Sequence, residues 1–250
     1  MSRRGWHYGR MIAFDTETTG VDVETARIVT AAVVDVDGAT GRTDVAAWLA
    51  DPGVEIPDEA AKIHGVTTEH ARAHGRPARE VIAEIAWLIG RTVGATTPLV
   101  VYNAPYDITL LDRELRRHGV AVQLPDRLHV IDPLVIDKGI DRYRKGSRKL
   151  TDTAAHYGVP MQDGTAHGCE ADALAAARVA WRIAATNPQI AGLSLAELHA
   201  RQVAWHAEQA SSFADYLRKK GKAAEADGVS RVWPMRPYTL ESAAAGAVAP

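Results

Sequence analysis

Two acidic residues near the start of the chain, Asp15 and Glu17, are spaced for metal chemistry. The apolar run M-I-A-F-D at 11–15 predicts a β-strand, and the two-residue period of a strand places both carboxylates on one face. Like charges this close repel unless a cation lies between them, and oxygen ligands suit Mg²⁺ or Mn²⁺. Taken alone, such a pair is more often a solvated strand end than a metal site.

A third acid, Asp107, stands in the motif N-A-P-Y-D directly after the apolar run 98–102. Pro105 is typical of a first helical turn, and on the helix that follows, Asp107 and Leu111 share the face toward the sheet. An unpaired buried carboxylate would be costly. The alternative is an acid that only favours the helix dipole. Because sites form at the carboxyl ends of parallel strands, we expect Asp107 to lie near Asp15.

The motif H-G-C-E-A-D supplies His167 and Asp172. Five residues of helix rotate by about 500°, so a fully helical segment would point the two side chains apart. Gly164 and Gly168 allow His167 to lie on a flexible loop while Asp172 belongs to a helix. Asp172 could then hold a metal, and the imidazole, with an ordinary pKa of about 6.5, could take a proton. The alternative is a surface histidine beside an acid that favours the helix dipole.

The most basic stretch, residues 138–149, holds six Lys or Arg against one Asp. Its cations could follow a nucleic-acid backbone, and its tyrosine could stack on a base. The candidate contacts are Tyr143, Arg144, Lys145 and Arg148. The alternative is a solvated loop, which is what most charge runs are.

These residues need a sheet to bring them together. Apolar runs predict three consecutive antiparallel strands at 11–15, 27–36 and 44–50, with a hairpin turn at 37–42, and later strands at 98–102 and 129–132. Helical spacing predicts helices over 78–91, from Pro105 to Gly119, and over 149–157 and 170–186. This order predicts an α/β fold with a mixed sheet and helices packed on it.

The chain divides into one domain and an extension. Residues 10–187 form the predicted α/β domain. Ser194 and Glu197 resemble a capping box that opens a helix running to about Lys220, within a C-terminal helical extension at 188–228. Residues 229–250, which end in an Ala-rich stretch, are expected to be a flexible tail.

Composition limits the classes of protein that fit. The chain has 250 residues, 46% hydrophobic and 24% charged, which is the balance of a globular protein. The single cysteine, Cys169, cannot form an internal disulfide, and the basic start has no apolar signal core, so we expect a cytoplasmic protein. No apolar run approaches the eighteen or so residues of a membrane span. With a net charge of -2, any nucleic acid would have to be held by local basic patches.

Together the motifs resemble one family. F-D-T-E-T-T-G at 14–20, N-A-P-Y-D at 103–107, and His167 with Asp172 are similar to the DEDDh 3'-5' exonucleases, the DnaQ-like proofreading family. The resemblance covers residues 10–187 and implies a ribonuclease H-like, five-stranded mixed sheet. It implies that the metal-binding carboxylates are Asp15, Glu17, Asp107 and Asp172, and that His167 is the general base.

Further site residues follow from the resemblance. I-H-G at 63–65 is similar to a loop that places a histidine on the terminal nucleotide, so His64 is a candidate substrate contact, with an ordinary loop histidine as the alternative. Thr18 could contact the 3' end, and Asn103 could hold the N-A-P-Y-D turn or touch substrate. Tyr106 stands where the family commonly has Phe, and Tyr102 where polymerase-associated members often have His.

The resemblance implies hydrolysis of DNA from the 3' end to 5'-mononucleotides, in proofreading or repair, and we expect two Mg²⁺ or Mn²⁺ ions per site. The expected partners are single-stranded or 3'-terminal DNA and a DNA polymerase, without a membrane. An RNA-directed relative with the same ligands, such as an oligoribonuclease, is one alternative. A non-catalytic nucleic-acid-binding scaffold on the same fold is another, although all five catalytic positions are filled.

Overall fold

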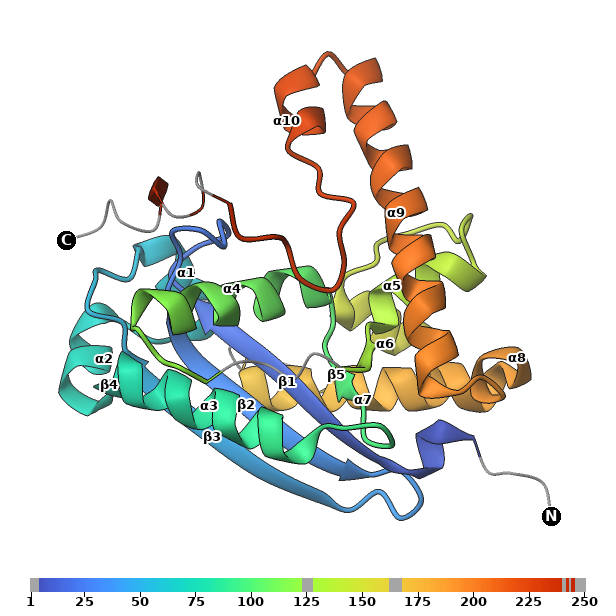
Figure 1. Ribbon diagram of the computed structural model, residues 1–250, viewed down its shortest axis with the longest axis horizontal. Helices are drawn as coiled ribbons and strands as arrows, with labels where there is room; N and C mark the ends of the chain where they lie inside the picture. The colour runs from blue at the N-terminus through green and yellow to red at the C-terminus, as the bar shows by residue number, and fades with distance from the viewer. Residues whose placement is uncertain (1–4, 123–127, 162–167, 240–241, 243, 246–250) are drawn as a thin grey trace.

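The computed structural model describes residues 5–122, 128–161, 168–239, 242 and 244–245. His167 therefore lies outside the described residues. Figure 1 shows a twisted sheet with helices on both faces and a long helix that projects away from it. No helix in the described ranges has the length and apolar character needed to cross a bilayer.

The described residues form one sheet of six strands in the order β4-β3-β2-β1-β5-β6. The strands are β1 (Arg10–Thr18), β2 (Ile28–Asp37), β3 (Thr43–Asp51), β4 (Arg76–Pro77), β5 (Leu99–Val100) and β6 (Val130–Ile131). The first three are antiparallel, and β5 and β6 run parallel to β1, as predicted. The predicted number of strands was one too few, because the two residues of β4 extend the sheet beside β3.

The helices are α1 (Asp58–His64), α2 (Thr68–His74), α3 (Ala78–Thr92), α4 (Ala104–Arg117), α5 (Pro133–Ile140), α6 (Leu150–His156), α7 (Cys169–Thr186), α8 (Pro188–Ala191), α9 (Leu195–Lys219) and α10 (Ala223–Asp227). The predicted helices correspond to α3, α4, α6, α7 and α9. The predicted capping box is present, since Ser194 Oγ accepts from the Glu197 amide and Glu197 Oε2 accepts from the Ser194 amide. The short helices α1, α2 and α5 were not predicted from the apolar periodicity.

Alternation along β1 builds two hydrophobic layers. Ile12 and Phe14 are fully buried on the face covered by α3 and α4, whereas Met11 and Ala13 are buried on the face covered by α7. Figure 1 shows these helices on opposite sides of the sheet. The same period therefore turns the odd-numbered residues at the carboxyl end of β1 toward α7 and the even-numbered ones toward α4.

The C-terminal segment is packed where a loose tail was expected. Trp233 is only 4% exposed and belongs to the core cluster under α3 and α4. The Arg236 amide donates to Thr109 Oγ1 at 2.9 Å, and Arg113 donates to the Pro237 carbonyl at 2.8 Å. Figure 1 shows this segment returning from α10 and crossing α4. The expectation therefore fails for residues 231–239, because a buried tryptophan and two hydrogen bonds hold them on the domain.

Candidate functional site

Three carboxylates meet at the carboxyl end of β1. Asp15 and Glu17 come from β1, and Asp172 comes from the first turn of α7. One oxygen of each lies within 4.8 Å of the others. The odd-residue face of β1 directs the first two toward α7, and the start of α7 at Cys169 brings Asp172 to meet them. Three half-buried carboxylates at this spacing form a donor set that suits a hard divalent cation.

Asp107 adjoins this cluster from the α4 side. Its side chain is buried, and Oδ1 accepts a 2.6 Å hydrogen bond from Thr16 Oγ1. Thr16 stands between the two carboxylates of β1 and points the other way along the strand's alternation. Asp107 does not belong to the group of three, but its charge acts on both Asp15 and Glu17. All four acids that the sequence singled out therefore lie close enough to interact.

The electrostatics of the cluster favour a bound cation. Burial, then the charges of Asp107, Asp172 and Glu17, hold the pKa of Asp15 well above its usual range. Burial, then the charges of Asp172 and Asp107, raise the pKa of Glu17 to about 7. Burial also raises the pKa of Asp107 to about 7, although the Thr16 hydrogen bond opposes the shift. A divalent cation among these oxygens would offset the repulsion that contributes to the shifts of Asp15 and Glu17.

Asp132, which sequence analysis missed, holds the α4 terminus in place. Its fully buried carboxylate accepts from the amides of Asn103 at 3.0 Å, Ala104 at 2.9 Å and Leu134 at 3.0 Å. It thus caps α5 and also fixes the turn before α4, where Asn103 has a left-handed φ of 62°. The available signal was an Asp directly before a Pro that opens a helix, which is typical of an N-cap.

The hydroxyl of Tyr106 has a structural use here. It lies 2.7 Å from Thr18 Oγ1, and both hydroxyls are within hydrogen-bonding distance of the Gly20 carbonyl. This contact joins the first turn of α4 to the end of β1. Burial is the main reason that the pKa of Tyr106 rises to about 12. The exchange of Phe for Tyr noted in the sequence therefore adds a polar tie next to the acidic cluster.

His64 ends α1, so its expected place in a loop was wrong. Its side chain is buried, and Nδ1 accepts from the Val66 amide at 3.2 Å. In the neutral ring the proton is therefore on Nε2. Burial lowers the pKa of His64, and a contact with the Thr18 backbone opposes that shift. The ring thus lies beside the end of β1, next to Thr18.

The basic stretch at 138–149 is partly neutralised inside the protein. Asp137, which is fully buried, accepts from Arg144 at 2.7 Å, from Arg148, and from the Tyr157 hydroxyl at 2.9 Å. Burial would raise the pKa of Asp137, but these hydrogen bonds hold it below its usual range. Two of the four predicted contacts in this stretch therefore have a structural role.

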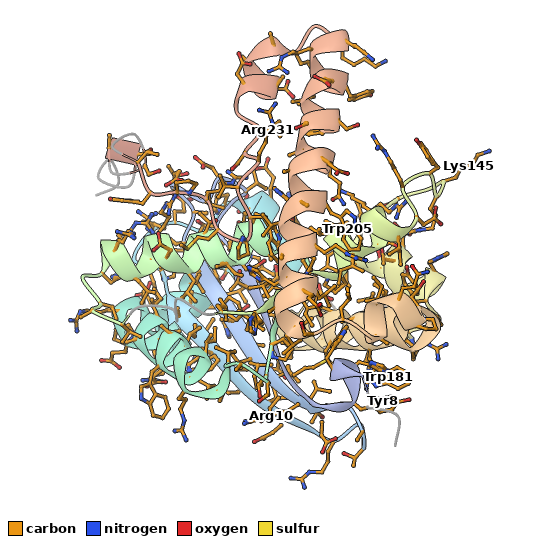
Figure 2. The ribbon with its side chains drawn as sticks, turned by 45° about the vertical axis from the view of Figure 1, so that its right-hand side comes forward. Tyr8, Arg10, Lys145, Trp181, Trp205 and Arg231 are labelled. Carbon is orange, nitrogen blue, oxygen red and sulfur yellow. The ribbon has the colours of Figure 1, made fainter. Side chains whose placement is uncertain are left out.

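The other two contacts in this stretch are free to meet a ligand. Tyr143 is 85% exposed, and Lys145 projects from the loop between α5 and α6, as Figure 2 shows. Asn103 is also exposed, at the start of α4. Its backbone amide donates to Asp132, and its side chain makes no capping hydrogen bond to α4 within the described residues.

Comparison with known proteins gives one consistent result. A family model described as Exonuclease (RNase_T) matches residues 12–180. The chain is 29% identical over 134 residues to DNA polymerase III subunit epsilon of Rickettsia prowazekii, an alignment that covers 52% of this chain and 56% of that protein. It is 30% identical over 175 residues to the uncharacterized exonuclease CP81 of Escherichia phage 186, covering 67% of this chain and 84% of that one. The chain spans just over half the length of the first curated relatives that it matches.

A solved structure gives the fold. The structure of E. coli exonuclease I in complex with an oligonucleotide matches with a TM-score of 0.61 and 19% identity, over 73% of this chain and 42% of that chain. The family model ends at residue 180, before α8, α9 and α10.

Proposed function

This chain belongs to the DnaQ-like exonuclease family, and from that premise we propose that it hydrolyses single-stranded or 3'-terminal DNA from the 3' end, releasing 5'-mononucleotides. The observation that carries the proposal is the convergence of Asp15, Glu17 and Asp172 within 4.8 Å, with Asp107 beside them. The relatives named as polymerase subunits support DNA as the substrate and a DNA polymerase as a partner. A cytoplasmic location stays a prediction.

The four carboxylates are a donor set of oxygen atoms that fits Mg²⁺ or Mn²⁺. Burial first, and then neighbouring negative charges, raise the pKa values of Asp15 and Glu17, and burial raises that of Asp107. When bound there, two such ions would supply an activated water and offset the charge that grows on the phosphate and the departing 3' oxygen. Asp15, Glu17 and Asp172 would hold them from one side and Asp107 from the other. Thr16 keeps Asp107 in position through its hydrogen bond.

The protein groups around the carboxylates have proposed roles of their own. His167 precedes α7 by two residues, and we assign to it the role of general base that removes the proton from the attacking water. Thr18 and His64, which lie side by side at the end of β1, would contact the terminal nucleotide. Tyr106 holds the end of β1 at Thr18, and Asn103, Tyr143 and Lys145 offer exposed polar contacts.

The test uses DNA labelled at the 5' end. A 3'-5' exonuclease gives a descending ladder with Mg²⁺ or Mn²⁺ and none with EDTA, and it leaves internally labelled circular single strands intact. Asp15→Asn and Asp172→Asn should abolish the ladder without loss of folding. A ladder of the same intensity with either variant would overturn the metal-site assignment.

Matched RNA, DNA and 3'-mismatched duplexes complete the experiment. Faster digestion of RNA would replace the DNA assignment with the RNA-directed alternative. Binding without any hydrolysis in Mn²⁺ would favour a scaffold.

A further inference from the structure

A second site lies between the C-terminal extension and the catalytic domain. A cavity of about 330 Å³ is bounded by α9, α5, the first turn of α4 and the segment that returns from α10. Its lining includes Asn103, Pro105, Lys138, His206, Phe213 and Arg236. Because Pro105 and Asp107 share the first turn of α4, a single helical turn separates this cavity from the acidic cluster.

The cavity collects positive charge. Lys138 is half-buried, and no hydrogen bond or ion pair of its ammonium group occurs among the described residues; burial lowers its pKa, and the charges of Asp132 and Asp137 oppose that shift. The guanidinium of the exposed Arg236 likewise has no hydrogen bond or ion pair among the described residues. Its backbone is held, because the amide donates to Thr109 and the carbonyl accepts from Arg113. Both cations act on His206: burial, then Lys138 and Arg236, lower its pKa, and a hydrogen bond with the Arg231 backbone opposes the shift. Like charges brought together in a cavity are unfavourable unless an anion lies among them.

The Asp132 carboxylate in the cavity wall acts on Lys138 but can offset only one of the two positive charges, and its oxygens already have partners. Asp132 has its oxygens engaged by the amides of Asn103, Ala104 and Leu134. Two further features leave the cavity open to an anion. Nδ1 of His206 is buried and has no hydrogen-bond partner in the described part of the chain. Asn103 offers an exposed amide at the rim.

An aromatic strip leads away from the cavity along α9. His206, Phe213, Tyr216 and Lys220 follow the helical period, so they lie on one side of the helix. Phe213 and Tyr216 are 53% and 54% exposed, and their rings are nearly parallel, with centroids 6.5 Å apart and an interplanar angle of 17°. The ammonium group of Lys220 lies 5.7 Å from the Tyr216 ring. Exposed rings that alternate with cations are typical of surfaces that bind single-stranded nucleic acid.

The cavity and the strip are held rigidly on the domain. Trp205 packs so closely on α5 that a Cβ on Gly139 would lie 2.4 Å from its ring. Figure 2 shows Trp205 on the α5 side of α9, with Arg231 on the returning segment at the other side. Gln209 Nε2 also donates to the Val135 carbonyl at 3.0 Å. The extension therefore presents its cations in a fixed position relative to the acidic cluster.

We propose that this cavity binds backbone phosphates of the strand whose 3' end reaches the acidic cluster, and that Phe213 and Tyr216 stack on bases further along that strand. Charge complementarity selects this occupant, because the cavity has two cations against one carboxylate and the strip offers ring faces, which together match a polyanion with bases. The inference rests on the function proposed above. Under this inference, the extension, which lies beyond the family match, contributes to the binding of long substrates.

The experiment separates binding of the strand from chemistry at its end. Lys138→Gln with Arg236→Gln, and Phe213→Ala with Tyr216→Ala, are compared with Arg72→Gln, which removes an exposed cation from α2. Oligothymidylates of about 4 and about 16 nucleotides are the substrates. Fluorescence anisotropy in Ca²⁺ measures their Kd, and hydrolysis in Mg²⁺ measures their KM. The p-nitrophenyl ester of thymidine 5'-monophosphate reports on the acidic cluster alone.

For the long strand, we expect the aromatic double variant to raise Kd and KM about tenfold. The cation double variant should reduce the slope of log Kd against log salt by about 1.4, or about 0.7 for each lost phosphate contact. Both double variants should hydrolyse the ester and the short strand at wild-type rates. The Arg72→Gln control should have wild-type values for every substrate. If a double variant fails to fold, Arg236→Gln alone is informative, because its side chain is exposed.

Three outcomes would count against the proposal or against its premise. Wild-type Kd, KM and salt slope for the long strand in every variant, with ester hydrolysis intact, would overturn the inference and leave the proposed function standing. Absence of ester hydrolysis in the wild type would overturn the proposed function, and the anisotropy series would still test the cavity. Loss of poly-L-glutamate binding in the cation variant, with oligothymidylate binding unchanged, would show that the cavity receives an acidic protein segment instead.

Discussion

Thr16 Oγ1 donates a 2.6 Å hydrogen bond to Asp107 Oδ1 across 91 residues of sequence. Thr16 is the middle residue of D-T-E, so the strand that supplies two carboxylates to one face uses the residue between them to fix a third carboxylate from the other face. The alternation of β1 thus organises both sides of the site.

Replacing this threonine tests the relationship. Thr16→Val keeps the β-branched shape in the strand but removes the donor to Asp107. Because partners that orient a metal-binding group usually affect affinity, we expect Mn²⁺ affinity to fall about 10- to 100-fold. Calorimetric titration with Mn²⁺ measures this, and Thr92→Val at the end of α3 is the control. Equal Mn²⁺ affinity in Thr16→Val and the wild type would show that the hydrogen bond does not serve the site.

The raised acid pKa values predict an unusual pH dependence in the absence of metal. Glu17 and Asp107 titrate near 7 in the folded protein against ordinary values of 4.5 and 3.8, so between about pH 4 and pH 7 the folded state binds more protons than the unfolded state. Stability contributed by these groups is therefore present at low pH and is lost as the pH rises through 7. Burial of Asp132, which raises its pKa to about 6, acts in the same direction.

Thermal unfolding in EDTA checks this sign. These groups should lower the Tm as the pH rises from about 5 to about 8, and Mn²⁺ should restore more of the Tm at the higher pH. Glu17→Gln removes one of the groups, so its profile should be flatter than that of the wild type. An identical profile in the variant would mean that the acidic cluster does not control this dependence.

Close contact between α5 and α9 predicts opposite effects at two glycines. A Cβ on Gly139 would lie 2.4 Å from Trp205, so Gly139→Ala should destabilise the protein by about 1–3 kcal/mol. A Cβ on Gly90, inside α3, would meet nothing within 4 Å, so Gly90→Ala should stabilise it by about 0.5–1 kcal/mol. Urea unfolding measures both. Equal effects of the same sign would contradict the packing described for α9.

Burial of Trp233 predicts that the C-terminal segment contributes to stability. Trp233→Ala removes a side chain that is 4% exposed and lies against His199, with ring centroids 4.9 Å apart. A loss of about 3–5 kcal/mol in the free energy of unfolding is expected, as for other buried aromatic residues. Trp87→Ala, at a position 56% exposed, should cost far less. If Trp233→Ala lowered the free energy of unfolding no more than Trp87→Ala does, the segment would not contribute to stability.

Local periodicity explains why much of the site was predictable. The two-residue period of β1 sets Asp15 and Glu17 on one face in any sheet, and a helix that begins near Cys169 must carry Asp172 in its first turn. The capping box at Ser194 depends only on residues three apart. Such features follow from backbone geometry, which does not depend on distant segments.

Long-range contacts explain what could not be predicted. Arg144 and Arg148 resembled free cations, but their charges are used by Asp137, whose burial depends on how α5 packs. Asp132 controls the start of α4 from the N-cap of α5, 28 residues from Ala104. In both cases the partner is a side chain whose burial the linear pattern does not reveal.

The sequence by itself determined which residue types occur at strand ends and helix starts, and hence the chemistry available to the protein. Only the tertiary structure decided which of those charges remain free. The return of residues 231–239 over α4 places the cations Arg236 and Lys138 beside His206, three residues separated by tens of positions in the chain. The physical reason is that local geometry repeats along the backbone, whereas charge neutralisation depends on which segments meet when the chain folds.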